Sequence, residues 1–288
     1  MASNPKTLNA NTDHKSNGKV VHNPWSDLRR FTDARIGLGR AGISLPTSEM
    51  LAFQLSHAQA RDAVGFALNI NEMSSRLSDL NPAAPVLHLR SQADDRTTYL
   101  QRPDLGRKLN QSSRTTLASF MAGQKQHTES KYDLAIVVAD GLSSLAVQQN
   151  TQPFISELLG QLGESQQLKL APITLVEQGR VAIGDDIGEL LNAQIVMVLI
   201  GERPGLSSPD SLGLYLTWAP KAGLSDACRN CISNIRPAGL SYEEAARRTV
   251  YLLREAKKLK LTGVNLKDRT QDDVIEHQQP NTNFLIAK

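Results

Sequence analysis

The sequence predicts an α/β protein in which a mainly parallel sheet follows an N-terminal, mostly helical domain. After residue 132, short β-branched runs alternate with helical patterns. That alternation is typical of βαβ units and therefore of parallel strands. Before residue 124, apolar residues instead recur at helical spacing. The polar residues 124–132 separate the two patterns and are the predicted linker.

The N-terminal part begins with residues 1–23, which are polar and without periodicity, so we expect a disordered tail. Residues 24–123 are predicted to form the helical domain. Within it, Leu51 and Leu55 share one face of a predicted helix. Pro103 predicts a helix start, because proline is favoured in the first turn of a helix.

The strands of the predicted sheet are short apolar runs bounded by turn residues. These runs are residues 133–141, 171–176, 194–200 and 213–218. Helices are expected near residues 153–159 and 186–191, and Ser241 begins a capping-box pattern that opens a third helix. The pattern indicates a Rossmann-like domain over residues 133–267, and the polar residues 268–288 are expected to be a flexible tail.

The overall composition argues against several classes of function. The formal net charge is +3 at pH 7 and no Lys or Arg block stands out, so nucleic acid is not an expected partner. No apolar run approaches the ~20 residues that a membrane-spanning helix needs. The N-terminus lacks the apolar segment of a secretory signal. Two cysteines in 288 residues fit a reducing cytoplasm better than a disulfide scaffold.

The stretch most informative about function is residues 201–211, which directly follow the predicted strand 194–200. Ligands of open α/β sheets bind at the carboxyl ends of strands. This segment combines Gly and Pro with an acid, Glu202, and a base, Arg203, at the strand exit. It is therefore a candidate ligand site, although an ordinary crossover loop is an equally good interpretation of the spacing.

Common catalytic and metal-binding motifs do not occur. No G-x-G-x-x-G follows the first predicted strand, and there is no Walker A sequence. Cys228 and Cys231 form a C-x-x-C pair without the second pair of a zinc ribbon, and they lie too late in the chain for a thioredoxin-like redox site. A chance pair of small residues is the favoured interpretation.

Isolated polar residues add little by themselves. His57 is interpreted as a solvated or capping residue. Asp140 and Ser143 follow a predicted strand and could hold a ligand, but turn chemistry and helix capping are the stronger interpretation of each. No catalytic residue and no metal ligand is predicted, so the residues alone indicate an α/β ligand-binding protein.

Seven short blocks between about residues 30 and 265 form a distinctive set. They are ARIGLGRAG (34–42), YLQRPDLGR (99–107), ADGLS (139–143), GRV (179–181), DIGE (186–189), GERPG (201–205) and CISNI (231–235). In this set and order the chain resembles the small subunit of adenosylcobalamin-dependent ethanolamine ammonia-lyase. The two tails and Cys228 fall outside the shared pattern.

The resemblance implies a subunit of a heteromeric lyase that converts ethanolamine to acetaldehyde and ammonia through an adenosyl radical. A larger, barrel-shaped subunit would bind ethanolamine, while this chain would help to hold adenosylcobalamin in a higher-order complex. The family's cofactor contacts correspond to Val181, Glu202 and Cys231 in this sequence. The resemblance also implies a cytoplasmic location, with packaging in a bacterial microcompartment left open.

The way the cofactor would be held also follows from the resemblance. Many other cobalamin enzymes supply a histidine to cobalt from an Asp-x-His-x-x-Gly motif, which this chain lacks. That fits base-on binding, in which the cofactor's own benzimidazole stays on the metal. A second interpretation remains open at this point: a non-catalytic cobalamin-binding or regulatory module without an enzyme partner.

Overall fold

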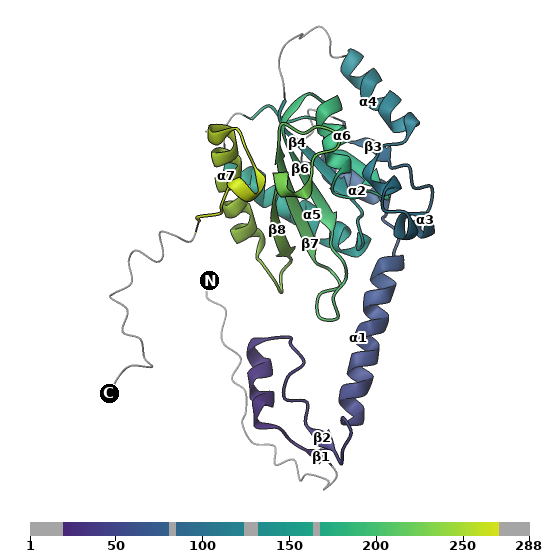
Figure 1. Cartoon of the computed structure of the whole chain (residues 1–288), viewed down its shortest axis with the longest axis vertical. Coiled ribbons are helices and arrows are strands. Elements are labelled where there is room, and N and C mark those ends of the chain that lie inside the picture. The colour runs from purple at the N-terminus through teal and green to yellow at the C-terminus, as the bar shows by residue number, and fades with distance from the viewer. Residues whose placement is uncertain (1–19, 81–84, 124–131, 164–167, 271–288) are drawn as a thin grey trace, which may run out of the picture. The chain divides into compact units, whose positions relative to one another are not determined.

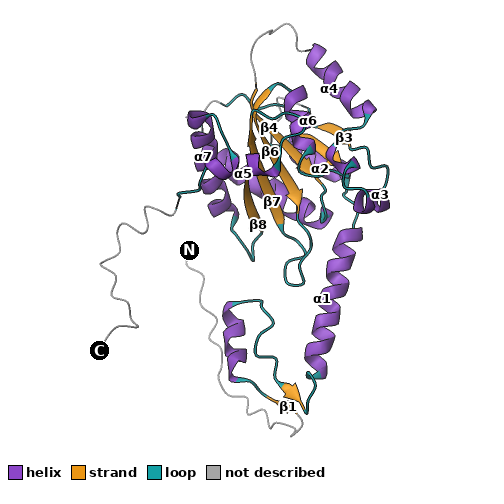
Figure 2. Ribbon diagram, viewed as in Figure 1, coloured by secondary structure: helices purple, strands orange, loops and turns teal. Residues whose placement is uncertain are grey.

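The computed structural model describes residues 20–80, 85–123, 132–163 and 168–270. Their contacts divide the chain into two compact units, residues 1–58 and 59–288. Most of the predicted linker and of both predicted tails lies outside the described residues. Tyr132, at the end of the predicted linker, already belongs to a strand, and so do Val20–Val21 of the predicted N-terminal tail. Figure 1 shows both units, and the colours of Figure 2 separate helices from strands. No described helix is both long and apolar enough to cross a membrane.

The first unit is small and almost without a core. Strand β1 (Val20–Val21) pairs antiparallel with β2 (Arg40–Ala41), and a 3-10 helix, η1 (Pro24–Phe31), lies between them in the chain. Helix α1 (Thr47–Gly65) begins here and continues into the second unit. Pro46 alone is buried among the described residues up to Ala58.

The second unit is built on one six-stranded sheet with the order β3-β5-β4-β6-β7-β8. The first four strands in this order are parallel to one another, whereas β7 is antiparallel to both neighbours. The sheet is therefore mainly parallel, as predicted. The strands are β3 (Leu87–Arg90), β4 (Tyr132–Ala139), β5 (Thr174–Glu177), β6 (Ala193–Gly201), β7 (Leu212–Trp218) and β8 (Arg229–Ile235).

Helices cover both faces of this sheet and bury an apolar cluster on each (Figure 1). The central strands β4 and β6 are buried on both faces, which explains their continuous apolar sequences. One face packs against α2 (Ile70–Ser78), α5 (Ser144–Leu162) and α7 (Tyr242–Leu259). The other packs against α4 (Gln111–Gly123) and α6 (Ile183–Leu190).

Two strands were not predicted. The edge strand β3 comes from within the region predicted to be a mostly helical domain, and it pairs with β5 through Leu87 opposite Thr174. The other edge strand, β8, has the sequence RNCISNI, and its exposed positions carry polar residues and Cys231. Edge strands are half solvated, so neither one shows the continuous apolar run of β4.

Pro103 does not open an α-helix, and the predicted helix start is confirmed only as a short 3-10 helix, η2 (Leu105–Arg107), that begins two residues later. Helix α3 (Arg96–Gln101) instead ends just before this proline, and Asp95 caps its beginning by accepting a 2.9 Å hydrogen bond from the Thr98 amide. Arg102 leaves the helical region with φ −124° and ψ 74°. The cause is steric, because the ring of a proline disfavours helical geometry at the residue before it.

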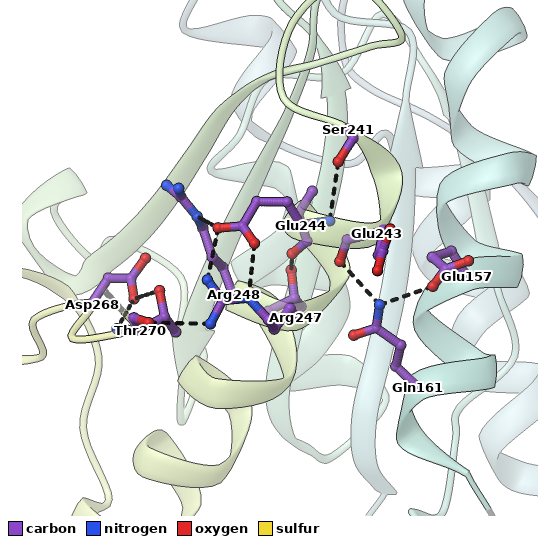
Figure 3. Close-up of polar contacts among 11 residues, drawn as sticks. Glu157, Gln161, Ser241, Glu243, Glu244, Arg247, Arg248, Asp268 and Thr270 are labelled. Atoms are coloured by element: carbon purple, nitrogen blue, oxygen red, sulfur yellow. Dashed lines mark hydrogen bonds and ion pairs between the residues drawn. The ribbon is translucent and has the colours of Figure 1, made fainter. Parts of the chain in front are cut away.

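The predicted cap of α7 is present in part (Figure 3). The Ser241 hydroxyl accepts a 3.3 Å hydrogen bond from the Glu244 amide. The Glu244 carboxylate does not reach back to Ser241, as a full capping box would require. It instead accepts hydrogen bonds from Arg247 at 2.8 and 2.9 Å and from Arg248 at 2.7 Å. These bonds, led by those from Arg247, lower the pKa of Glu244 to about 2.

Candidate functional site

The strand order creates a divergence point between β4 and β6. From β4 the chain passes through α5 to β5 on one side, and then returns through α6 to β6 on the other side of β4. Helices α5 and α6 therefore cover opposite faces, and the carboxyl ends of β4 and β6 open apart. Ligands of open α/β sheets bind at this kind of position.

Two glycines allow the strand ends to approach closely here. Gly141 has φ +61°, and a Cβ at this position would overlap the carbonyl oxygen of Gly201. A Cβ at Gly201 would overlap the carbonyl oxygen of Ser143. The Leu142 amide also donates a 2.9 Å hydrogen bond to Gly201. The backbone itself therefore forms the floor of the divergence point.

An open pocket of about 390 Å³ lies at this edge of the sheet. It brings together side chains that follow β4, β5 and β6, with Tyr215 from β7. The lining includes Leu142, Val181, Ile200, Glu202, Arg203 and Tyr215. Two of the three predicted cofactor contacts, Val181 and Glu202, are therefore in one pocket although they are far apart in sequence.

Glu202 is held firmly in place by neighbours at the ends of β7 and β8. Its carboxylate accepts hydrogen bonds from the hydroxyls of Ser211 and Ser233, and a 3.2 Å bond from the Asn234 amide. The Glu202 amide donates a 2.9 Å bond to the Ser211 carbonyl. Since a carboxylate offers about four acceptor positions, one remains for a ligand.

Cys231, the third predicted contact, lies beside the pocket rather than in its lining. It sits on β8 directly opposite Tyr215 of β7, and its side chain is exposed. Desolvation against the sheet raises the pKa of the Cys231 thiol, so the group is protonated at neutral pH. A protonated thiol acts as a small packing group or weak donor. Cys228 is also a free thiol.

The back of the pocket is an aromatic–cation stack that was not predicted. Tyr99 is fully buried, with the guanidinium of Arg180 4.2 Å and that of Arg96 4.9 Å from its ring centre. Arg180 also donates a 3.1 Å hydrogen bond to the Tyr99 carbonyl. The only sequence signal was that Tyr99 and Arg180 each lie in a block shared with the family.

Asp140 and Ser143 have the turn and capping roles that were the stronger interpretation of each. Buried Asp140 accepts hydrogen bonds from the amides of Gln178 and Gly179 at 2.9 and 3.0 Å. Desolvation raises the pKa of Asp140 to about 6. Ser143 caps α5, and its hydroxyl donates a 2.7 Å bond to the Pro209 carbonyl, which fixes the loop after β6.

The described part of the chain contains no group of three His, Cys, Asp or Glu side chains that could hold a metal ion. No histidine contributes to the lining of the pocket at the ends of β4 and β6. His57 lies on α1, where its ring is tilted against Phe53 with 6.4 Å between ring centres. The lining of the pocket includes one acid, Glu202, two arginines and several apolar side chains.

Comparison with known proteins gives a consistent result over nearly the whole chain. A family model described as ethanolamine ammonia-lyase light chain matches residues 22–267. The ethanolamine ammonia-lyase small subunit of Pseudomonas aeruginosa (strain UCBPP-PA14) is 54% identical over 269 residues, which cover 93% of this chain and 96% of that protein. The small subunit from Pseudomonas putida (strain F1) is 54% identical over 282 residues, covering 96% and 99%. This chain belongs to the ethanolamine ammonia-lyase light chain family.

Proposed function

We propose that this chain is the small subunit of an ethanolamine ammonia-lyase and that it holds adenosylcobalamin at the divergence point between β4 and β6. The observation that carries the proposal is the meeting of Val181 and Glu202 in one pocket, with Cys231 next to it. Family membership supports the enzyme class. The domain that would hold the cofactor is Rossmann-like in the sense that its ligand site lies where the strand order reverses.

The lining suits the chemistry of a corrin ring. A corrin is broad and apolar with amide groups around its rim. Val181 and Leu142 offer apolar contact, and Glu202 offers a carboxylate acceptor for an amide N–H. Cys231 adds a small side chain at the edge. The pocket is open, so a larger partner subunit has to cover the remaining face of the cofactor and exclude water.

In this proposal the residues of this chain bind and orient the cofactor. No described residue of the pocket pairs a nucleophile with a base. Desolvation raises the pKa of Tyr215 above its usual value, so this phenol stays protonated at neutral pH. When bound, adenosylcobalamin supplies the radical chemistry that deaminates ethanolamine. A cytoplasmic enzyme of one large and one small subunit type, assembled into a higher-order complex, is the form that we propose.

The test is reconstitution with the large subunit and adenosylcobalamin, followed by assays for acetaldehyde and ammonia. We expect turnover by the mixture and none by this chain alone. Glu202→Gln should weaken cofactor binding by up to about a hundredfold, because a hydrogen bond to a charged group contributes roughly 1.5–3 kcal/mol. Glu255→Gln on the outer helix α7 is the matched control and should bind the cofactor normally.

Two results would point elsewhere. Cofactor binding without turnover in the presence of the large subunit would favour the alternative, a cobalamin-binding or regulatory module. Equal cofactor affinity for the Glu202→Gln and Glu255→Gln complexes would remove Glu202 from the site.

A further inference from the structure

We infer that Asp140 is a positioning residue that holds the turn Gln178–Val181, so that Val181 is presented to the cofactor in a fixed place. The inference rests on the proposed function, because it concerns how the proposed cofactor site is built. It assigns a role to the ADGLS and YLQRPDLGR blocks, neither of which supplies one of the predicted cofactor contacts.

The connection between Asp140 and the turn is direct. Asp140 lies just beyond β4, and the turn lies just beyond β5, its neighbour in the sheet. One carboxylate oxygen accepts the Gln178 amide at 2.9 Å, and the other accepts the Gly179 amide at 3.0 Å. A single side chain thus orients two successive peptide groups ahead of Val181.

The turn needs such a support because its backbone is unusual. Gln178 has φ +55°, in the left-handed region that non-glycine residues seldom adopt. Residues in such conformations persist only when the surroundings hold them there. The two hydrogen bonds from the turn to Asp140 are of the charge-assisted kind when the carboxylate is ionised, and these are stronger than neutral ones.

Two further hydrogen bonds hold the same turn from the other side. The buried Tyr99 hydroxyl donates a 3.2 Å hydrogen bond to the Gly179 carbonyl. The Arg180 amide donates a 2.8 Å bond to the Gly106 carbonyl. A Cβ at Gly106 would lie 2.8 Å from Cγ of Arg180, so only glycine fits between this loop and the turn. The block around residues 99–107 therefore works as a clamp.

Arg96 links the clamp to Asp140. Its guanidinium donates a 2.7 Å hydrogen bond to the Gly141 carbonyl, lies 3.9 Å from the Asp140 carboxylate and stacks on Tyr99. The burial that raises the pKa of Asp140 also removes competing water from these bonds. Asp140 therefore fixes the turn that carries Val181 relative to the end of β4.

The experiment compares Asp140→Asn with Asp186→Asn, both in complex with the large subunit. Asparagine keeps the size of aspartate but has only one acceptor oxygen, so one of the two turn amides loses its partner. Asp186 is a matched control: it is also buried, accepts a 3.2 Å bond from the Leu109 amide and pairs with Arg114, but it does not touch the turn. Tyr99→Phe removes a different hold on the same turn and provides a second variant.

Two quantities are measured: the dissociation constant for adenosylcobalamin, from its absorption spectrum, and hydrogen exchange of the turn amides in the complex without cofactor. For Asp140→Asn we expect the dissociation constant to rise about tenfold and the Gln178 and Gly179 amides to exchange faster. Tyr99→Phe should change both in the same direction by less. Asp186→Asn should change neither.

The outcomes separate this inference from the proposed function. If Asp140→Asn and Tyr99→Phe bind the cofactor normally while Val181→Ala binds it weakly, the site is right and the positioning role is wrong. An Asp186→Asn complex that loses affinity as much as Asp140→Asn would also overturn it, since general destabilisation would then explain both. Normal binding by Val181→Ala and Glu202→Gln together would instead reject the proposed cofactor site.

Discussion

Two ion-pair clusters in the second unit use the same chemistry in opposite surroundings. Between α6 and β8, Arg229 donates hydrogen bonds of 2.6 and 2.7 Å to Asp185, and the two side chains are 2% and 1% exposed. At the start of α7, Arg247 pairs with Glu244 at a similar distance, but these side chains are 47% and 30% exposed (Figure 3). The pair distances are alike, whereas the exposure of the side chains differs strongly.

The comparison teaches that burial, and not the number of bonds, decides what a carboxylate does for stability here. An exposed pair exchanges its contacts readily with water and is screened by salt, so it contributes little. A buried pair is costly to create, and its members depend on one another once they are dehydrated. The same rule applies next to the candidate site, because Asp140, which holds the turn before Val181, is also buried.

The variant Asp185→Asn is the strongest test of whether the buried pair differs in energy from the exposed one. The substitution removes the buried partner of the Arg229 guanidinium and leaves it only the exposed Asp226 carboxylate, 3.1 Å from its Nε. Removing one partner of a buried pair costs about 3–5 kcal/mol. We expect a loss of that size in the free energy of unfolding, measured by urea denaturation. A loss below about 1 kcal/mol would mean that water reaches Arg229 and that the two clusters are energetically alike.

The same contrast between a buried and an exposed position can be tested sterically by comparing Gly201→Ala with Gly160→Ala. The new methyl group at Gly201 would meet the Ser143 carbonyl between two buried strand ends, and overpacking of this kind costs about 3 kcal/mol. Gly160 lies on an exposed turn of α5, where nothing is within 4 Å of an added Cβ. There alanine should stabilise the helix by about 0.5–1 kcal/mol. Thermal unfolding of both variants checks the two signs.

The pH dependence of stability should have opposite signs for Asp140 and Glu244. The folded-state pKa of Asp140 is about 6, above its ordinary 3.8, so its contribution is most favourable below pH 3.8 and is lost as the pH rises through 6. The pKa of Glu244 is lowered from 4.5 to about 2, so its contribution is present above pH 4.5 and is lost as the pH falls towards 2.

The free energy of unfolding of wild type and of Asp140→Asn should be measured by urea denaturation from pH 4 to pH 7. The difference between the two free energies should change by about 2 kcal/mol over this range. Wild type should lose stability relative to the variant as the pH rises. The corresponding difference for Glu244→Gln should be flat over that range, apart from a small decline near pH 4. A flat curve for Asp140→Asn would contradict the burial argument.

The smallest expected effect is that of Glu244→Gln at neutral pH. The glutamine still leaves the Ser241 cap of α7 in place, since the cap uses the Glu244 amide. The loss of the exposed pairs should cost at most about 1 kcal/mol and should shrink in 1 M salt. A salt-independent loss larger than this would show that Arg247 and Arg248 act as a buried pair does.

Much of the sheet could be predicted because its central strands are apolar on both faces. The apolar runs of β4, β6 and β7 predict these strands, and α7 has a clear cap and an amphipathic pattern. The edge strands could not be predicted, since the sequence of a strand with one solvated face contains as many polar residues as a loop. Pro103 was a poor guide to the start of a helix, because proline is common both at the start of a helix and just after its end.

The candidate site divides in a similar way. Its contact residues could be named from a resemblance, and the strand-exit loop at Glu202 could be suspected from the residues alone. The residues that hold the turn before Val181 could not be predicted. Their hydrogen bonds join positions 38 to 81 residues apart, such as Asp140 to Gln178 and Tyr99 to Arg180. A single sequence carries no record of which distant side chains meet.

The place of β3 at the edge of the sheet has a consequence for how the chain is made. Leu87 pairs with Thr174, and β5 lies between β3 and β4. Ribosomes add about 5–20 residues per second, so β3 leaves the ribosome several seconds before its partner strand β5 exists. During that interval the apolar side of β3, including Leu89, has no sheet to join. Until β5 is made, the nascent chain therefore holds this strand without the sheet that buries it in the folded protein.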